Sequence, residues 1–268
     1  MVIDIHTHAF PEAIAARTIE FLKDKMYRQS GICVENSTDG TVDGLIKSMD
    51  NAGIDKSIVM PIATKISQTT TINNFAETLR TDRIISFGSV HPLDNDAQKV
   101  LEDLKSRGFL GIKLHPEFQD FYIDSPEAVN ILKICERLGL FVLIHSGADL
   151  GYPAPYHCTP ERLENTLMHI SGDNLIAAHL GAFMMWDRIL DKIVNMPIYI
   201  DTAAVGTCIK PDVYRDIIRS HGAERVLFGS DSPWEDQSHA LNILNSTGIG
   251  ENELELIKHK NAQRLFGI

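Results

Sequence analysis

The stretch VIDIHTH, residues 2–8, is the starting point for predicting the fold. A short apolar run ends there in two histidines, His6 and His8, that are spaced one residue apart. On a β-strand, residues i and i+2 point to the same face, so both imidazoles are expected to converge on one point. Two convergent histidines are a typical start of a metal site.

Seven further short runs rich in apolar and β-branched residues follow this one. They span residues 56–62, 84–90, 110–116, 141–147, 174–180, 198–204 and 225–231. Segments with helical periodicity separate them, as in residues 128–138, where apolar and charged side chains fall on different stripes. Eight strands alternating with helices predict an α/β fold, a parallel (β/α)₈ barrel that takes up residues 1–268 as one domain.

The interval between the first two predicted strands is longer than the later ones. We expect a helix from Pro11 to about Arg28, an irregular stretch from about Cys33 to Gly44, and a second helix from Leu45 to Ala52. An insertion at this point would overhang the top of the barrel. It is a candidate lid or substrate-specificity element, and a purely structural addition is the alternative.

Further metal-ligand residue types stand at the ends of other predicted strands. His145 and His179 each close an apolar run, and Asp231 follows the last one. A lone histidine is more often a hydrogen-bonded interior residue, but five such residues at equivalent strand ends favour a site. The carboxyl ends of the strands form the face of a parallel barrel where chemistry takes place.

Six motifs spread over the chain resemble the amidohydrolase superfamily, in the branch that includes aminocarboxymuconate-semialdehyde decarboxylase and related decarboxylases, hydratases and lactonases. They are DIHTH (4–8), GIKLHP (111–116), LIH (143–145), AHLG (178–181), FGSD (228–231) and NAQRLFG (261–267). The resemblance implies a metal-dependent barrel enzyme.

Carried over residue by residue, the resemblance implies a single divalent ion held by His6, His8, His145 and Asp231. Zinc is the expected ion, because three nitrogens and a carboxylate leave a position open for water, and manganese is the alternative. His179 would lie beside the ion as a proton shuttle or electrophile. Asp231 would also act as a base.

Lys113 leaves a two-ion alternative open. It shares its strand face with His115, so both are expected to face the barrel interior. In two-metal members of the superfamily a carboxylated lysine bridges the ions, and His145 and His179 would then bind the second ion. An unmodified Lys113 would instead bind a substrate carboxylate. We favour one ion.

Other residues of this face are candidates for substrate contact. His115, Tyr152 and Trp234 follow three different strands, and the aromatic rings suit a small, partly apolar substrate. Lys113, Lys65 and Arg188 are the cations placed to receive a carboxylate. Asp201 is expected either to orient a histidine or to cap a helix.

Two reactions fit this set of residues. In the first, a metal-activated water hydrolyses an amide, lactone or ester bond; in the second, an aromatic or unsaturated acid loses CO₂ without oxidation. We favour hydrolysis, as the broadest class that the resemblance implies. A structural or vestigial metal site is the weakest alternative, because closed zinc sites draw on local ligand spacing.

The composition limits the classes of partner that we expect for this protein. A formal net charge of -11 argues against nucleic acid, which needs a basic surface. We see no uninterrupted apolar run of membrane-spanning length and no basic-then-apolar leader, so we expect a cytoplasmic protein with a small-molecule substrate. The resemblance leaves a homodimer open. The remaining histidines, His157, His169, His221, His239 and His259, are expected at the surface.

Overall fold

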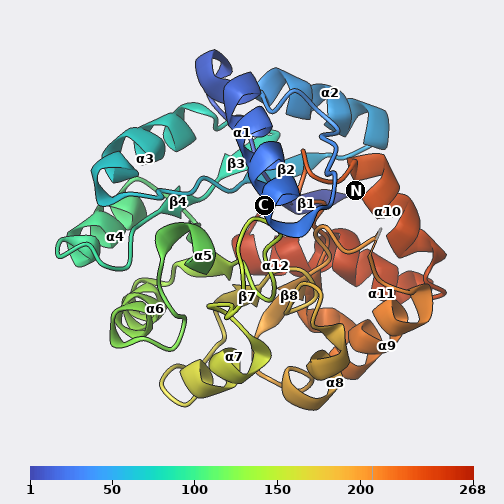
Figure 1. Cartoon of the computed structure of the whole chain (residues 1–268). Coiled ribbons are helices and arrows are strands. Elements are labelled where there is room, and N and C mark those ends of the chain that lie inside the picture. Colours follow the sequence, from blue (N-terminus) through green and yellow to red (C-terminus); the bar gives the residue numbers. More distant parts are fainter. Residues whose placement is uncertain (207) are drawn as a thin grey trace.

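A ring of parallel strands surrounded by helices forms the protein in a computed structural model that describes residues 1–206 and 208–268 (Figure 1). The strands are β1 (Ile3–Thr7), β2 (Lys56–Val59), β3 (Ile84–Ser86), β4 (Gly88–Ser89), β5 (Gly111–Leu114), β6 (Phe141–Ile144), β7 (Leu175–Ala177), β8 (Tyr199–Asp201) and β9 (Val226–Leu227). Each of the eight predicted runs contains a strand, and the run at 84–90 is divided at Phe87 into β3 and β4. The observed strands are shorter than the predicted runs, because their carboxyl ends turn into loops.

The strands close on themselves in sequence order. Hydrogen-bonded neighbours run β1-β2-β3 and β4 to β9, all parallel. The last strand returns to the first: the Ile5 amide donates to the Phe228 carbonyl at 2.9 Å, and Thr7 forms a parallel bridge with Ser232. The predicted parallel barrel is therefore present.

Helices cover the outside of the ring. They are α1 (Glu12–Ser30), α2 (Val42–Ala52), α3 (Thr69–Thr78), α4 (Ala97–Ser106), α5 (Pro116–Gln119), α6 (Pro126–Leu138), α7 (Pro160–Leu167), α8 (Ile189–Lys192), α9 (Pro211–His221), α10 (Gln237–Ser246), α11 (Glu251–Glu255) and α12 (Asn261–Phe266). Three 3₁₀ turns, η1 (Ile66–Gln68), η2 (Trp186–Arg188) and η3 (Ala223–Arg225), and one π-helical segment, η4 (Leu256–Lys260), complete the described elements.

Local sequence explains where a helix such as α6 begins and ends. The Ser125 hydroxyl accepts from the Ala128 amide at 3.2 Å, and Pro126 occupies the first helical position, where its missing N–H costs nothing. Gly139 ends the helix at φ 62°, a left-handed conformation that glycine adopts without strain.

The apolar core has two layers. The larger packs the helices against the outside of the barrel. The smaller one fills the barrel and includes Ile3, Ile5 and Leu143, together with Phe266 from α12. The Phe266 ring meets those of Phe87 and Phe141 edge to face, with centroids 5.8 and 5.0 Å away. α12, seen across the middle of the barrel in Figure 1, therefore plugs the end opposite to the carboxyl ends of the strands.

Both ends of the described chain lie at this plugged end. The Met1 sulfur is 3.3 Å from Nε2 of Gln263, which belongs to α12, and the N-terminal ammonium is 3.9 Å from Asp55. None of the helices in the described ranges combines the length and the hydropathy that crossing a membrane requires.

One prediction for the remaining histidines is wrong. His221 was expected at the surface, yet it is only 6% exposed at the end of α9, where Nε2 donates to the Ile198 carbonyl at 3.0 Å. That carbonyl precedes β8, so the ring ties the helix to the barrel. Its position at the polar end of an amphipathic segment suggested a surface location, so the sequence pattern did not predict this role.

Candidate metal centre

The predicted ligand residues meet at the carboxyl ends of the strands. They come from β1 (His6), the loop after it (His8), β5 (Lys113), and the loops after β6, β7 and β9 (His145, His179 and Asp231). All are buried or nearly so, and the most exposed side chains are those of His8 and Asp231, at 12% and 13%. The site is therefore assembled from distant parts of the chain and shielded from solvent.

Three of these residues form a compact group. Oδ1 of Asp231 lies 3.3 Å from Nε2 of His6 and 3.1 Å from Nε2 of His8. Burial alone raises the pKa of Asp231, but the two histidines outweigh burial and hold it well below its usual value. Asp231 is therefore a carboxylate facing two ring nitrogens.

A departure from regular strand geometry lets His6 face this group. Ile3 and Ile5 both point into the apolar barrel interior, so strict alternation would turn His6 away from it. The pairing of β1 with β2 shifts its register between Asp4 and Thr7. The shift brings His6 round to the inside as well, which alternation alone does not predict.

His145 and His179 form a second pair. Nε2 of His179 lies 3.0 Å from Nδ1 of His145, and the rings of His6 and His179 have centroids 5.3 Å apart. His145 is therefore connected to the compact group through His179. The structure thus brings the four predicted ligands to one end of the barrel, with His179 between His145 and the other three.

Backbone carbonyls determine which nitrogen of each ring carries the hydrogen. Nδ1 of His8 donates to the Met60 carbonyl at 2.9 Å, and Nδ1 of His179 donates to the Ala203 carbonyl at 2.9 Å. Nε2 of His145 donates to the Ala148 carbonyl at 3.0 Å. In neutral rings the opposite nitrogens then carry lone pairs, and these are the nitrogens that point into the site.

Asp201 does the same for His6. Its Oδ2 accepts from Nδ1 of His6 at 2.8 Å, and its Oδ1 accepts from the His179 amide at 2.8 Å. Asp201 is fully buried and burial raises its pKa. Of the two predicted roles for Asp201, orienting a histidine is confirmed by this geometry.

The converging acceptors fit a cation. The ring nitrogens of His145 and His179 face each other, and Nε2 of His8 faces a carboxylate, without a hydrogen between neutral partners. Such contacts are repulsive unless a positive charge lies among them. Nε2 of His6 faces the same carboxylate and also accepts from Nζ of Lys113. Imidazole nitrogens and a carboxylate are the ligands that zinc, manganese and similar ions use in proteins.

Lys113 also points into this site. Its Nζ donates to Nε2 of His6 at 2.9 Å, and its side chain is 1% exposed. Burial lowers its pKa to about 8, although Asp231 and Asp201 act in the opposite direction. Burial, followed by Lys113, holds the pKa of His6 well below its usual value. Lys113 is thus in direct contact with one of the predicted ligands.

His115 lies next to the site in a different arrangement. Its Nδ1 accepts from the Phe118 amide at 3.4 Å, so Nε2 carries the hydrogen and faces Oδ2 of Asp149 at 3.4 Å. This ring directs an N–H rather than a lone pair at its acidic neighbour. His115, His145 and Asp149 lie close enough together to hold an ion, but in this tautomer His115 presents an N–H and not a lone pair to Asp149.

Asp149 was missed in the sequence. Its side chain is 10% exposed, and burial raises its pKa to about 6. It stands four residues after His145 in the loop behind β6, and that proximity to a predicted ligand was the available signal.

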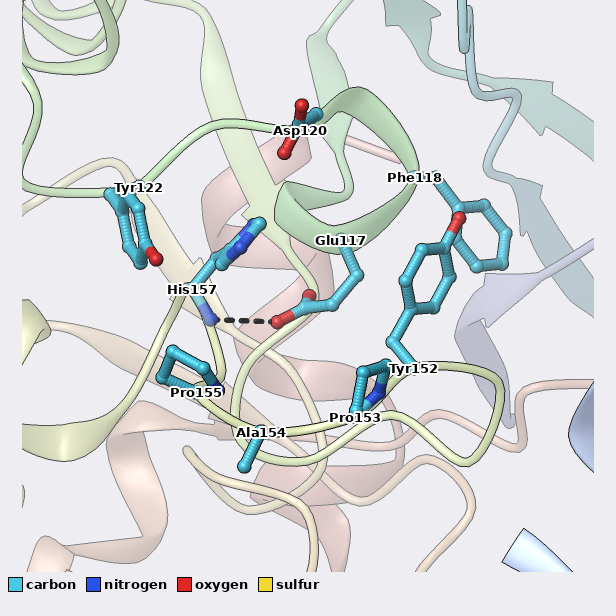
Figure 2. A pocket seen from close by; sticks show the side chains of 9 residues that line it. All are labelled: Glu117, Phe118, Asp120, Tyr122, Tyr152, Pro153, Ala154, Pro155 and His157. Atoms are coloured by element: carbon cyan, nitrogen blue, oxygen red, sulfur yellow. Dashed lines mark hydrogen bonds between the residues drawn. The ribbon is translucent and has the colours of Figure 1, made fainter. Parts of the chain in front are cut away.

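Tyr152 lines a pocket of about 480 Å³ beside the metal centre (Figure 2). The pocket lies between α5 and the loop 152–157, and its other walls include Phe118 and Glu117. Glu117 is 4% exposed; its Oε1 accepts from the His157 amide at 2.8 Å, and burial raises its pKa to about 7. Glu117 is the second acidic residue that the sequence analysis missed.

The other predicted contacts are placed differently. Trp234 is half-buried after β9, with its amide bonded to the Asp231 carbonyl at 2.9 Å. Lys65 is exposed, and Arg188 is bonded to Glu161, so neither cation is placed to receive a substrate.

Backbone strain is concentrated at the site. His179 has φ 62° and Asp231 has φ 70°, left-handed values that residues with a Cβ rarely adopt. The Trp186 indole supports His179 by donating to its carbonyl at 3.1 Å. Non-glycine residues held in this conformation are typical of functional sites.

The fold and site define a parallel barrel with a histidine and aspartate centre at the carboxyl ends of its strands. The family model described as Amidohydrolase matches residues 3–268, so the chain belongs to the amidohydrolase family, as its motifs indicated.

A curated relative and two solved structures are similar to this chain. Gamma-resorcylate decarboxylase from Rhizobium sp. (strain MTP-10005) is 26% identical over 70% of this chain and 71% of its own length. A 2,6-dihydroxybenzoate decarboxylase bound to 2,6-dihydroxybenzoate has TM-score 0.69, 19% identity, and coverage of 100% of this chain and 99% of its own. A dihydroxybenzoic acid decarboxylase from Polaromonas sp. JS666, with manganese and 2-nitroresorcinol bound, has TM-score 0.69, 18% identity, and coverage of 99% and 96%.

Proposed function

We propose that this protein is a metal-dependent decarboxylase that removes CO₂ without oxidation from a small aromatic carboxylic acid. The observation that carries the proposal is the set of imidazole lone pairs that converge beside Asp231, each fixed by a hydrogen bond on the far side of its ring. The three relatives described above are decarboxylases of aromatic acids, which favours this reaction over the hydrolysis that the sequence analysis preferred.

The proposed ligands are His6, His8, His145 and Asp231, holding one divalent ion. Zinc suits three imidazoles and one carboxylate. Manganese is present in the Polaromonas relative and is the alternative ion. When bound, such an ion would hold the substrate oxygens and stabilise negative charge that develops on them.

The protein residues then have separate tasks. Decarboxylation of an aryl carboxylate breaks the bond between the ring and CO₂ and places a proton on the same ring carbon. His179 is the proposed proton donor in its protonated form: the Ala203 carbonyl holds the hydrogen on Nδ1, so the proton that is delivered is the one carried on Nε2, which faces the site. Phe118 and Tyr152 offer apolar surface for the substrate ring, and burial of the site excludes water.

The test is turnover by protein reconstituted with zinc or manganese. Release of CO₂ from 2,6-dihydroxybenzoate and related hydroxybenzoates is followed by mass spectrometry, beside a panel of lactones, esters and amides. We expect CO₂ and the corresponding phenol, and neither from the His8→Ala variant. Turnover of the hydrolysis panel without CO₂ release from any acid would overturn the proposal in favour of hydrolysis.

A further inference from the structure

A line of aromatic rings leads outward from the metal centre. The His145 ring stacks on His115 with centroids 4.2 Å apart, and His115 stacks on Phe118 at 3.7 Å. The Phe118 ring is 5.7 Å from Tyr152, and the two stand side by side in Figure 2. We call these four residues the ring stack. The His145, His115 and Phe118 rings are stacked nearly parallel and Tyr152 is tilted by 37° to Phe118, so the stack leads from a proposed ligand to the pocket of Figure 2.

Lys25 lies at the outer end of the ring stack. It belongs to α1, which passes in front of the strands in Figure 1. Its Nζ is 3.4 Å from the centroid of Tyr152 and 5.7 Å from that of Phe118. Its aliphatic chain runs close to Gly151, where an added Cβ would meet Lys25 Cδ at 3.6 Å. The side chain is therefore held against the loop that follows β6.

The ammonium group of Lys25 has ring faces but no oxygen partner. Among residues 1–206 and 208–268, no hydrogen bond or ion pair to Nζ is present, although the side chain is half-buried. An ammonium group has three donors, and cation–π contacts satisfy none of them as a hydrogen bond does. Burial lowers the pKa of Lys25, and Asp149 opposes this effect. A half-buried ammonium in this state is prepared to receive an anion.

Other cations near the site are already engaged or lie elsewhere. Lys113 is bonded to His6 at the base of the site. Lys23, also on α1, is bonded to Glu35 at 3.0 Å. Arg28 is bonded to Asp24, so among the described residues Lys25 is the α1 cation that contacts the ring stack without a carboxylate bonded to it.

We propose that Lys25 determines specificity by binding a second anionic group of the substrate, one that points away from the metal, so that aromatic dicarboxylates are the preferred ligands. This inference rests on the proposed function, since it takes the first carboxylate to lie at the proposed ion. The substrate ring lies beside the outer end of the ring stack, at Phe118 and Tyr152, and the distal carboxylate supplies the missing oxygen partner of Lys25. α1 then contributes directly to substrate selection.

Binding to the metal-loaded protein tests this proposal independently of turnover. Isothermal titration compares benzene-1,3-dicarboxylate with benzoate, which lacks the distal group. We expect the wild type to prefer the dicarboxylate at least about tenfold. The Lys25→Met variant should lose this preference and bind benzoate as the wild type does, whereas Lys25→Arg should keep most of it. Lys23→Met, which removes the same charge from the same helix, should behave as the wild type.

Equal affinity of the wild type for both acids, no binding of either, or a preference that survives in Lys25→Met would each overturn the assignment. The proposed function fails in a different way. A dicarboxylate preference that depends on Lys25, without CO₂ release from any acid, would retain the binding role and reject decarboxylation. CO₂ release with a dicarboxylate preference that Lys25→Met leaves unchanged would retain decarboxylation and reject the binding role of Lys25.

Discussion

The two ends of the barrel are built from opposite kinds of side chain. At the carboxyl ends of the strands, histidines and carboxylates are buried next to one another, two of them on left-handed backbone. At the other end, Phe87, Phe141 and Phe266 pack edge to face without a polar group among them. At the carboxyl ends of the strands, buried charged groups destabilise the fold but serve the proposed chemistry. At the other end, apolar contacts stabilise the fold.

The sharpest test of this division removes a proposed ligand. We expect Asp231→Asn to bring activity to the background level and to abolish tight metal binding, while the barrel remains folded. Asparagine tolerates the left-handed backbone at this position, so the loss reports on the carboxylate. Elemental analysis and circular dichroism measure the two outcomes. Full activity and metal content in the variant would reject the site.

His179→Asn separates metal binding from proton transfer. We expect about a 1000-fold fall in kcat, within the range for general acid catalysis, with one metal equivalent retained. Metal content and kcat are measured on the same sample, beside the intact mass of the wild type. Loss of one of two equivalents, with an added carboxylate on Lys113, would instead support the two-ion alternative.

Phe266→Ala tests the packing at the plugged end of the barrel. We expect a loss of about 4 kcal/mol in the free energy of unfolding, as for other buried phenylalanines, without change in kcat of the folded fraction. Urea unfolding followed by circular dichroism measures the free energy of unfolding. Turnover at low temperature measures kcat. A fall in kcat with undiminished stability would contradict the division between the two ends.

Glu117 gives a smaller, pH-dependent effect at the carboxyl end. Its folded pKa of about 7 lies above the ordinary value of 4.5, so the folded state binds the proton more tightly. Its contribution is therefore fully present below pH 4.5 and is lost as the pH rises through about 7. We expect Glu117→Gln to reduce the loss of stability between pH 5 and 8, by on the order of 3 kcal/mol at most.

Urea unfolding at several pH values measures this difference, with the exposed Glu20→Gln as the matched control. An identical pH dependence for wild type and Glu117→Gln would show that the buried carboxyl does not govern stability in this range.

Much of this division is visible in the sequence. Strands with apolar runs and polar ends predict the barrel, and they place His145, His179 and Asp231 on one face. The sequence pattern does not predict the local departures from regular geometry. The shifted register in β1 turns His6 inward, and the interruption at Phe87 divides one predicted strand.

Such sequence patterns do not predict contacts between loops. Asp149, Glu117 and Lys25 acquire their neighbours only when α1, α5 and the loop after β6 meet. Periodicity describes which face of an element is buried, and it contains no information about which loops touch.

The contact between Met1 and Gln263 has a practical consequence. Since both ends of the described chain lie at the plugged end of the barrel, a short linker joining them would leave the carboxyl face untouched. The protein is therefore suited to circular permutation, with new ends opened in exposed loops between outer helices. Attachment to a solid support through either present end would likewise orient the ring stack and the proposed metal centre toward the solution.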